Sequence, residues 1–312
     1  MVAVAEATGR YARRVAIWTA ERTVDEPLVR RLLAQFPELR PPRSLRPLSE
    51  GWDYAIWAVD EAWAFRFPRR TMVVPGTERE IAALPRLAPL LPLPVPEPVF
   101  VGGPTDDFPW PFFGSRLLPG RELGELSFDD TGREAVGVQL AGFLRALHTV
   151  DVDVDLPPDA NRRADMRERV PKTREQLAEL ERLGIWHSAP EVETILAEAE
   201  PLPPPALDAV VHGDLHFRQL LATDAGELTG VLDWVDLCRS DPAVDLSMLW
   251  AYLPPRARPA FLEAYGMVDD AQLLRARVVA LSVWGALANY GHAEGHAGIA
   301  AEALSGLRRA LS

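Results

Sequence analysis

The chain has 312 residues, of which 48% are hydrophobic and 25% charged, a composition typical of a folded globular protein with one large or two modest domains. Its 45 acidic residues exceed its 33 basic ones and leave a net charge of −12, which disfavours nucleic acid as a partner because like charges repel. The only cysteine, Cys238, excludes an internal disulfide and a cysteine-based zinc site.

The first 119 residues predict a small, strand-rich lobe. Its predicted elements are a helix over 24–35, strands over 44–48, 54–59 and 63–67, a helix over 77–90, and strands over 99–102 and 112–118. Thr77 is placed as the N-cap of the second helix, because Glu80 follows three residues later as in a capping box. The proline-dense segment 91–98 is expected to be an extended connector.

From residue 120 onward the chain is predicted to be mainly helical, with one strand-rich island at about 208–235. The predicted helices cover about 130–148, 162–183, 190–199, 241–252, 256–266, 269–290 and 296–311. This order of elements predicts an α+β fold of two lobes, residues 1–119 and 120–312, joined near residue 120. A ligand bound between two such lobes is a common arrangement.

The charge is unevenly distributed between these lobes. Residues 1–120 hold 15 basic and 14 acidic groups, a net charge of +1, so residues 121–312 hold the remaining 18 and 31, a net charge of −13. An acidic C-terminal half favours a cationic small molecule as its ligand. Nearly all of the positive charge is arginine, because Lys172 is the only lysine in the chain.

No segment predicts secretion or membrane insertion. The first residues lack the unbroken apolar core of a signal peptide, and the longest apolar stretch, Val278–Ala288, is too short to span a bilayer. We therefore expect a cytoplasmic protein without a membrane partner.

Chemistry-bearing residues are concentrated in the strand-rich island. Two apolar strands each end in a carboxylate, Asp214 and Asp233, and Gln219 lies between them. Phosphoryl transfer needs a carboxylate that accepts the proton of the attacking hydroxyl and oxygen ligands that hold Mg²⁺ on the nucleotide phosphates. Asp214 suits the first role, and Gln219 and Asp233 suit the second.

These residues, in this order, resemble the catalytic loop and metal motif of the aminoglycoside phosphotransferase family, which has a protein-kinase-like fold. The family's H-G-D-x-x-x-x-N, Ile/Leu-Asp-Trp and D-P-x-x-D-L motifs correspond to His212-Gly213-Asp214 with Gln219, Leu232-Asp233-Trp234, and Asp241-Pro242 with Asp245-Leu246. The resemblance implies that Asp214 is the catalytic base and that Asp233 and Gln219 bind magnesium. It also implies that His212 braces the loop and that Asp245 binds the loop's backbone.

The N-terminal half shows the same resemblance. Residues 49–70 resemble the family's nucleotide-covering hairpin and following strand, in which Gly51 would allow a close turn over the phosphates. Arg66 would contact the α- and β-phosphates, with Glu80 (or Glu78) as its partner on the next helix. The hinge that presents backbone groups to the nucleotide base would be formed by Arg116, Leu117 and Leu118.

Two positions depart from the family's usual pattern. Arg66 stands where the family usually has lysine, and arginine is a planar fork rather than a compact ammonium group. Gln219 stands where the family usually has asparagine, and its amide oxygen reaches one methylene further. Macrolide phosphotransferases, a branch of the family, resemble the chain at both points, with R-x-P-R in the strand (here Arg66-Phe67-Pro68-Arg69) and a residue other than asparagine in the loop. Their hairpin also resembles Gly51-Trp52-Asp53-Tyr54.

Several other side chains could have either a structural or a functional role. Trp57 and Trp63 are expected in the core, and His148 is expected to be a packed or capping histidine. Arg218 would either steady the transferring phosphate or pair with a nearby acid. The substrate wall is expected near one helix end, at Trp284, Asn289, Tyr290, His292 and Glu294.

The sequence therefore predicts a Mg²⁺-dependent phosphotransferase that moves the γ-phosphoryl of ATP or GTP to a hydroxyl of a small cationic molecule, such as an aminoglycoside or macrolide antibiotic. One alternative is a metabolic kinase for an amino alcohol, sugar or amino acid. The other is a nucleotide-binding pseudokinase, which the substitutions at Arg66 and Gln219 would suit. The acceptor, the preferred purine and the oligomeric state are left open.

Overall fold

The computed structural model describes residues 20–39, 42–51 and 53–312, which fall into two compact units. The first comprises the chain up to Pro85 together with Pro96–Leu117, and the second comprises Arg86–Val95 and Leu118–Ser312. The expected boundary at residues 119 and 120 lies near one of the junctions. The segment 86–95 belongs to the helical unit, where the Val231 N–H donates to the Pro94 carbonyl oxygen at 3.0 Å.

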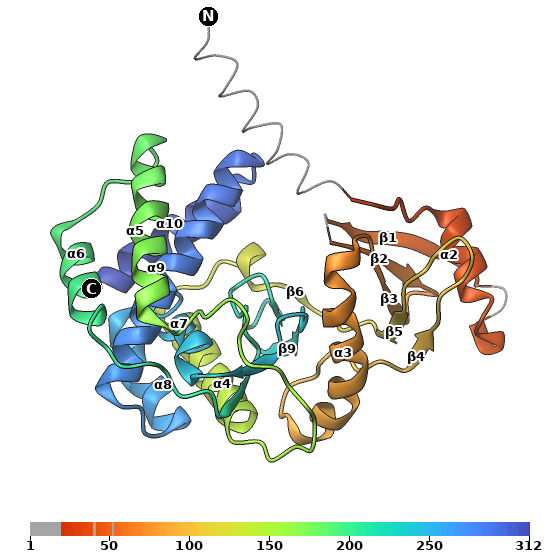
Figure 1. Ribbon diagram of the computed structural model, residues 1–312, viewed down its shortest axis with the longest axis horizontal. Coiled ribbons are helices and arrows are strands. Elements are labelled where there is room, and N and C mark those ends of the chain that lie inside the picture. Colours follow the sequence, from red (N-terminus) through yellow and green to blue (C-terminus); the bar gives the residue numbers. More distant parts are fainter. Residues whose placement is uncertain (1–19, 40–41, 52) are drawn as a thin grey trace, which may run out of the picture. The chain divides into compact units, whose positions relative to one another are not determined.

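A five-stranded antiparallel sheet forms the first unit, in the order β1-β2-β3-β5-β4 (Figure 1). Its strands are β1 (Leu45–Glu50), β2 (Tyr54–Val59), β3 (Trp63–Pro68), β4 (Phe100–Gly102) and β5 (Phe112–Arg116). These bounds confirm the five predicted strands and differ from them only at the ends. The predicted connector over 91–98 forms neither helix nor strand, in keeping with its prolines.

The hairpin between β2 and β3 turns at Asp60 and Glu61. Both residues have positive φ, 54° and 50°, as a two-residue type I′ turn requires. The Asp60 carboxylate accepts hydrogen bonds from the N–H groups of Arg43 (2.6 Å) and Ser44 (2.9 Å), which ties the start of β1 to the turn. Because the turn fixes the register of β3, it also fixes the face of the sheet on which Arg66 lies.

Aromatic side chains form the core between the sheet and α2 (Glu26–Leu33), the first predicted helix. The rings of Phe65, Phe67 and Phe112 are buried, with centroids 5.0–6.5 Å apart. Trp57 belongs to the same buried cluster, as predicted, and Trp63 packs against it while partly buried. Ring packing of this kind gives β3 a rigid support.

The prediction that Thr77 is an N-cap is wrong, because α3 (Val74–Leu87) begins three residues earlier. Thr77 lies inside the helix, where its hydroxyl donates to the Val73 carbonyl oxygen at 3.2 Å and shares a hydrogen bond with the Tyr54 hydroxyl at 3.0 Å. Pro75 accounts for the earlier start, because proline is favoured in the first turn of a helix. Glu80 lies on this helix and is fully buried.

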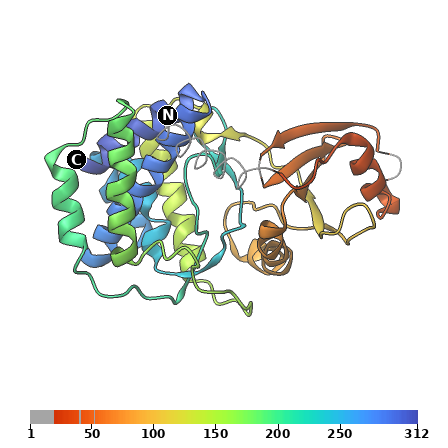
Figure 2. The ribbon, with the colours of Figure 1, turned by 45° about the horizontal axis from the view of Figure 1, so that its top comes forward.

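A long apolar helix, α9 (Asp270–Ala293), forms the centre of the second unit. The other α-helices of this unit are α4 (Asp130–His148), α5 (Met166–Arg182), α6 (Pro190–Ala199), α7 (Ser247–Ala251), α8 (Arg258–Tyr265) and α10 (Ala297–Leu311). Four of them, α5, α6, α7 and α10, pack against α9. Figure 2 shows the green α5 and α6 beside the blue α9 and α10. Apart from 241–252, the predicted helices are confirmed with shifts at their ends.

Two small antiparallel sheets make up the strand-rich island. One contains β6 (Arg121–Glu122), β8 (Leu220–Ala222) and β9 (Leu228–Val231), and the other pairs β7 (Ala209–Val211) with β10 (Cys238–Ser240). The sequence did not predict β10, because a strand of three residues carries no readable alternation. Because β7 is paired with β10, the end of β7 is held in place. The chain therefore leaves this sheet at a fixed point.

The predicted helix over 241–252 is instead a 3₁₀ turn, Pro242–Val244, followed by α7. Asp241 caps the turn by accepting the Ala243 N–H at 2.9 Å. Pro242 contributes no N–H to a longer helix. This break places Asp245 between the turn and α7.

One described helix, α9, is long and apolar enough to cross a membrane by length and composition. In the structure 61% of its most apolar window is buried within the protein, and it serves as a core helix. The first residues, which were assessed for a signal peptide, lie outside the described residues.

The contact between α9 and α10 can be tested at a glycine. A Cβ at Gly306 would collide with the Trp284 ring, whereas a Cβ at Gly298, on the same helix, would meet nothing within 4 Å. Gly306→Ala should therefore lower the free energy of unfolding by about 1–3 kcal/mol through overpacking. Gly298→Ala, the matched control, should leave it unchanged or raise it by about 0.5–1 kcal/mol. Urea unfolding measures both, and equal values for the two variants would contradict the packing described.

Candidate active site

The loop from His212 to Gln219, between β7 and β8, carries the central candidates, and its geometry depends on Gly213. That residue has φ of 91°, and a Cβ there would collide with the Asp236 carbonyl oxygen, so other residues would be strained. The His212 ring is fully buried. Its Nδ1 accepts the Asp214 N–H at 3.3 Å, and its Nε2 lies 2.8 Å from the Leu232 carbonyl oxygen, to which it donates. His212 thereby links the loop to the end of β9.

A buried carboxylate, that of Asp245, holds the start of this loop. Its Oδ2 accepts the His212 N–H at 2.8 Å, and its Oδ1 accepts the Gly213 N–H at 3.1 Å. A third partner is His148, whose Nε2 lies 3.1 Å from Asp245 Oδ2 and whose Nδ1 lies 2.8 Å from the Tyr265 hydroxyl. Burial alone would raise the pKa of Asp245, but its hydrogen bonds and the neighbouring histidines lower it below the usual value.

The role of His148 was missed from the sequence. It was expected to be a packed or capping histidine at the end of α4, and it is indeed buried. Its distance of 97 positions from Asp245 along the chain left no local pattern that could reveal the contact. In the structure His148 contacts the carboxylate of Asp245, which in turn accepts the N–H groups at the start of the loop from His212 to Gln219.

Asp214 lines a cavity of about 280 Å³ in the second unit, and its side chain is 40% exposed. Burial raises the pKa of Asp214 to about 7, and the carboxylates of Asp236, Asp233 and Asp245 act in the same direction, against the opposing charge of Arg163. A carboxylate with a pKa near neutrality suits general base chemistry.

His216 lies beside Asp214 and is kept neutral. Burial lowers its pKa to about 3. Its Nδ1 accepts the Arg218 N–H at 3.2 Å, so its proton is on Nε2, which lies 3.8 Å from Asp214 Oδ2. His216 also lies 3.4 Å from the Gln219 amide nitrogen. The sequence analysis assigned no role to His216.

Asp233 and Gln219 lie together at the end of the loop, with Gln219 Nε2 3.3 Å from Asp233 Oδ2. Asp233 has a positive φ of 64°, which is uncommon outside glycine and turns its carboxylate away from the line of β9. A carboxylate and an amide offer the oxygen ligands that Mg²⁺ uses when nucleotide phosphates and water complete its shell. Among the described residues no group of three or more His, Cys, Asp or Glu could hold a metal ion. Asp233 offers carboxylate oxygens to such a metal, whereas Gln219 faces Asp233 with its amide nitrogen, so its oxygen could serve as a ligand only with the amide turned over.

The cavity beside Asp214 is lined by the loop from His212 to Gln219 and by residues of, or just before, the helices α5 and α9. Its lining consists of Arg163, Arg169, Gln176, Asp214, His216, Val279, Ser282, Val283, Ala286, Leu287 and Tyr290. Of the expected substrate wall, only Tyr290 is among these residues. Trp284 is fully buried and packs on Phe217 with ring centroids 6.1 Å apart, so its assignment to the wall is wrong.

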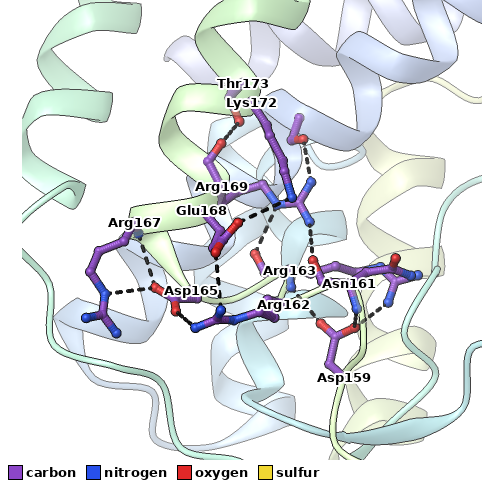
Figure 3. Close-up of polar contacts among 11 residues, drawn as sticks. Asp159, Asn161, Arg162, Arg163, Asp165, Arg167, Glu168, Arg169, Lys172 and Thr173 are labelled. Carbon is purple, nitrogen blue, oxygen red and sulfur yellow. Dashed lines mark hydrogen bonds and ion pairs between the residues drawn. The ribbon is translucent and has the colours of Figure 1, made fainter.

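Arginine side chains around the start of α5 complete the cavity and were missed from the sequence (Figure 3). Arg163 is buried and Arg169 is half-buried. They precede the loop by about 50 residues, and arginines are common throughout this chain, so no spacing singled them out. Arg218 takes the second of its two predicted roles, with Nε 3.6 Å from Glu122 Oε2.

In the first unit, Arg66 and Glu80 form an ion pair, with Arg66 Nε 3.6 Å from Glu80 Oε2. The Arg66 guanidinium lies over the Tyr54 ring, 3.7 Å from its centroid. The structure thus brings together the strand arginine and Glu80, rather than Glu78. Arg66 interacts with Glu80 through its charge and with Tyr54 through the stacking of its planar guanidinium. A lysine ammonium group could pair with Glu80 but would not stack in the same way.

The remaining residues that were expected to contact the nucleotide lie in the hairpin after β1 and in the hinge over residues 116–118. Gly51 does not have a positive φ, and a Cβ there would come no closer than 3.9 Å to the Tyr54 carbonyl oxygen, so the expected use of its freedom in φ is not seen. Trp52 lies outside the described residues. The Leu117 N–H donates to the Ala62 carbonyl oxygen at 2.9 Å, and the Arg116 guanidinium stacks on Trp63. Leu118 belongs to the second unit.

The chain is similar to known proteins in sequence and in fold. A model described as the phosphotransferase enzyme family matches residues 44–278, most of the chain. Among curated proteins, the uncharacterized protein YcbJ of Bacillus subtilis (strain 168) is 33% identical over 61 residues, and this match spans 20% of each chain.

Solved structures of antibiotic phosphotransferases share the fold. The GDP and kanamycin complex of APH(2")-IIia has a TM-score of 0.64 and 21% identity, covering 89% of this chain and 96% of that chain. The GDP complex of wild-type aminoglycoside 2'-phosphotransferase-IIIa has a TM-score of 0.63 and 23% identity, covering 90% and 96%. Macrolide 2'-phosphotransferase MphH from Brachybacterium faecium has a TM-score of 0.58 and 22% identity, covering 89% and 97%. These likenesses confirm the predicted two-lobed, kinase-like α+β fold class.

The contacts of Asp245 predict a loss of stability when its charge is removed. Asp245→Asn should lower the free energy of unfolding by about 3 kcal/mol at pH 7, because an amide cannot accept from all three donors. The pKa of Asp245 is lowered on folding, so its stabilisation is present above an unfolded pKa of about 3.9 and is lost as the pH falls below it. Urea unfolding at pH 7 and pH 3 measures this: the difference between wild type and variant should shrink at pH 3. The control is Asp224→Asn at an exposed ion pair with Arg121, and a similar small effect for both variants at pH 7 would refute the assignment.

Proposed function

This chain belongs to the phosphotransferase enzyme family, and we propose that it transfers the γ-phosphoryl group of ATP or GTP to a hydroxyl of a small molecule. The observation that carries the proposal is the position of Asp214. It lines a cavity, its pKa is raised to about 7, and its loop is held by the buried Asp245. Acceptors with hydroxyl groups are those that the family's antibiotic phosphotransferases use.

Asp214 is the base in this proposal. It accepts the proton of the acceptor hydroxyl as the hydroxyl oxygen bonds to the γ-phosphorus, and the bond from that phosphorus to the bridging oxygen breaks, releasing the nucleoside diphosphate. The neutral His216 ring lies beside it, with Nε2 3.8 Å from Asp214 Oδ2, too far for a hydrogen bond, and adds no charge to the site. The cavity holds the acceptor in place, which is where most of the catalytic effect in phosphoryl transfer comes from.

The nucleotide-binding roles are proposed for each unit by itself. Asp233 and Gln219 would hold Mg²⁺, which supplies charge neutralisation on the phosphates. Arg66, fixed by Glu80 and Tyr54, would bind the α- and β-phosphates, and Gly51 and the backbone of residues 116–118 would contact the nucleotide. A cytoplasmic location suits this assignment, because ATP and GTP are available there.

The acceptor hypothesis that the relatives suggest is a cationic antibiotic. One solved neighbour is a complex with kanamycin and another is a macrolide phosphotransferase, and an antibiotic acceptor would make the protein a resistance enzyme. A metabolic acceptor such as an amino alcohol, sugar or amino acid uses the same machinery. A panel of these compounds, assayed for phosphorylated product by mass spectrometry, separates the two.

Replacing the base should abolish turnover selectively. Asp214→Asn should lower kcat about 10²–10⁴-fold while leaving nucleotide binding intact, because only the proton acceptor is lost. The exposed Asp224→Asn serves as the control. In the wild type, kcat/KM should rise with pH through about 7 and level off above it, since the deprotonated form of Asp214 is active. A profile that stays flat down to pH 5, or full activity of the variant, would rule out Asp214 as the base.

Mg²⁺-dependent nucleotide binding through Asp233 would distinguish an active kinase from a pseudokinase. Thermal unfolding is followed during titration with ATP or GTP, with and without Mg²⁺. Stabilisation of the wild type should be larger with Mg²⁺, and Asp233→Asn should remove the Mg²⁺-dependent part while keeping the nucleotide-dependent part. Stabilisation that ignores Mg²⁺, together with no product from any acceptor, would instead favour the pseudokinase.

A further inference from the structure

The cavity beside Asp214 has a basic wall, although residues 121–312 carry a net charge of −13. Its lining includes two guanidinium groups, those of Arg163 and Arg169, and only one acidic side chain, that of Asp214. The acidic excess of this half of the chain therefore lies outside the cavity lining. A molecule bound there meets positive charge in the same cavity as the carboxylate that is proposed as the base.

Arg163 is already paired with carboxylates of the protein. Its Nη1 lies 2.7 Å from Asp159 Oδ1, and its Nη2 lies 2.9 Å from Asp236 Oδ1. Burial alone would lower the pKa of Arg163, but the charges of Asp236 and Asp159 raise it. Arg163 is thus a fixed part of the wall, and its charge is largely compensated.

Arg169 is held differently, because its hydrogen bonds go to uncharged oxygens. It donates to the carbonyl oxygens of Arg163 (3.2 Å) and Asn161 (3.3 Å), as Figure 3 shows, and to the Ser282 hydroxyl (3.2 Å). These three bonds fix the plane of the guanidinium against the cavity. A guanidinium has five N–H donors, so among the described residues two of them have no protein partner.

The charge of Arg169 is also uncompensated at contact distance. Within the described part of the chain no carboxylate lies within 4.0 Å of its guanidinium, and the nearby Glu168 instead pairs with Arg162 (3.2 Å) and Lys172 (3.6 Å). Burial, followed by the charge of Arg163, lowers the pKa of Arg169. Arg169 is thus a half-buried cation at the cavity wall, with N–H donors that have no acceptor among the described residues. An anionic group of a ligand would supply both the acceptors and the counter-charge.

The remainder of the wall limits the size and polarity of that ligand. Val279, Val283, Ala286 and Leu287 of α9 give an apolar side. The volume of about 280 Å³ lies just below the range of roughly 300–1,000 Å³ for small-molecule sites. The site therefore suits a compact molecule that has an apolar body and polar groups.

We propose that the acceptor is a small hydroxylated carboxylic acid, whose carboxylate binds the Arg169 guanidinium while its hydroxyl meets Asp214. The inference rests on the proposed function. The planar fork of arginine matches a carboxylate with two parallel hydrogen bonds. A polyamine such as kanamycin would instead bring its ammonium groups against Arg163 and Arg169, which disfavours it.

Three acceptors with the same hydroxymethylphenyl body and an anionic, a neutral or a cationic group test the proposal: 4-(hydroxymethyl)benzoate, 4-(hydroxymethyl)benzamide and 4-(hydroxymethyl)benzylamine. Binding is measured by titration calorimetry on the wild-type protein with Mg²⁺ and a non-hydrolysable ATP or GTP analogue, and transfer by mass spectrometry with ATP or GTP. The benzoate should bind most tightly and have the highest kcat/KM, and the benzylamine the lowest. Preference for the benzylamine or for kanamycin, equal binding of all three, or binding of none would overturn the proposal. If the benzoate binds best yet no donor yields product, the proposed function fails while this inference stands.

Variants of two neighbouring arginines show whether Arg169 recognises the carboxylate. Arg169→Gln should weaken benzoate binding and raise its KM about ten- to a hundredfold, while the benzamide values stay unchanged, and Arg169→Lys should restore part of the loss. Arg167→Gln is the matched control, because Arg167 is 61% exposed and pairs with Asp165 instead of lining the cavity. Equal losses for benzoate and benzamide in Arg169→Gln would show a purely structural role and contradict the proposal.

Discussion

The buried carboxylate of Asp245 is the constraint on which the candidate site depends. It accepts the N–H groups of His212 and Gly213, and His148 holds it from α4. These contacts turn the chain sharply after β7, at a position where the backbone of Gly213 admits no side chain. Asp214 is therefore fixed at the cavity by a network that is itself buried and fully bonded, which is the condition for a precise polar site. The buried Asp245 carboxylate thus positions the Asp214 carboxylate at the surface of the cavity.

The sequence revealed this site because its parts are close together along the chain and have fixed spacing. The fold class followed from the order of the predicted elements and from the resemblance carried by residues 210–246. What the sequence hid depends on contacts between distant segments: His148 against Asp245, and Arg169 against Ser282. Trp284 was misplaced because helical spacing does not say which face of a fully apolar helix is covered. Thr77 and the helix over 241–252 were misjudged where prolines shift the start of a helix.

The structure bears on two features of the composition, the scarcity of lysine and the acidic excess of the C-terminal half. The absence of lysine before residue 172 leaves the strand position to Arg66, which pairs with Glu80 and stacks on Tyr54. The acidic excess of the C-terminal half, by contrast, does not reach the cavity lining, where arginines predominate. Overall charge is thus a poor guide to the charge of a site, because a few buried groups decide the local field.

The loop held by Asp245 is expected to keep the Asp214 carboxylate in surroundings that raise its pKa to about 7. A ¹³C NMR titration of the protein labelled at its aspartate carboxyl carbons measures this pKa, with the Asp214 signal assigned by its loss in Asp214→Asn. A midpoint near pH 7 is expected. A value at the ordinary aspartate pKa of about 3.9 would contradict the placement of Asp214 as the base.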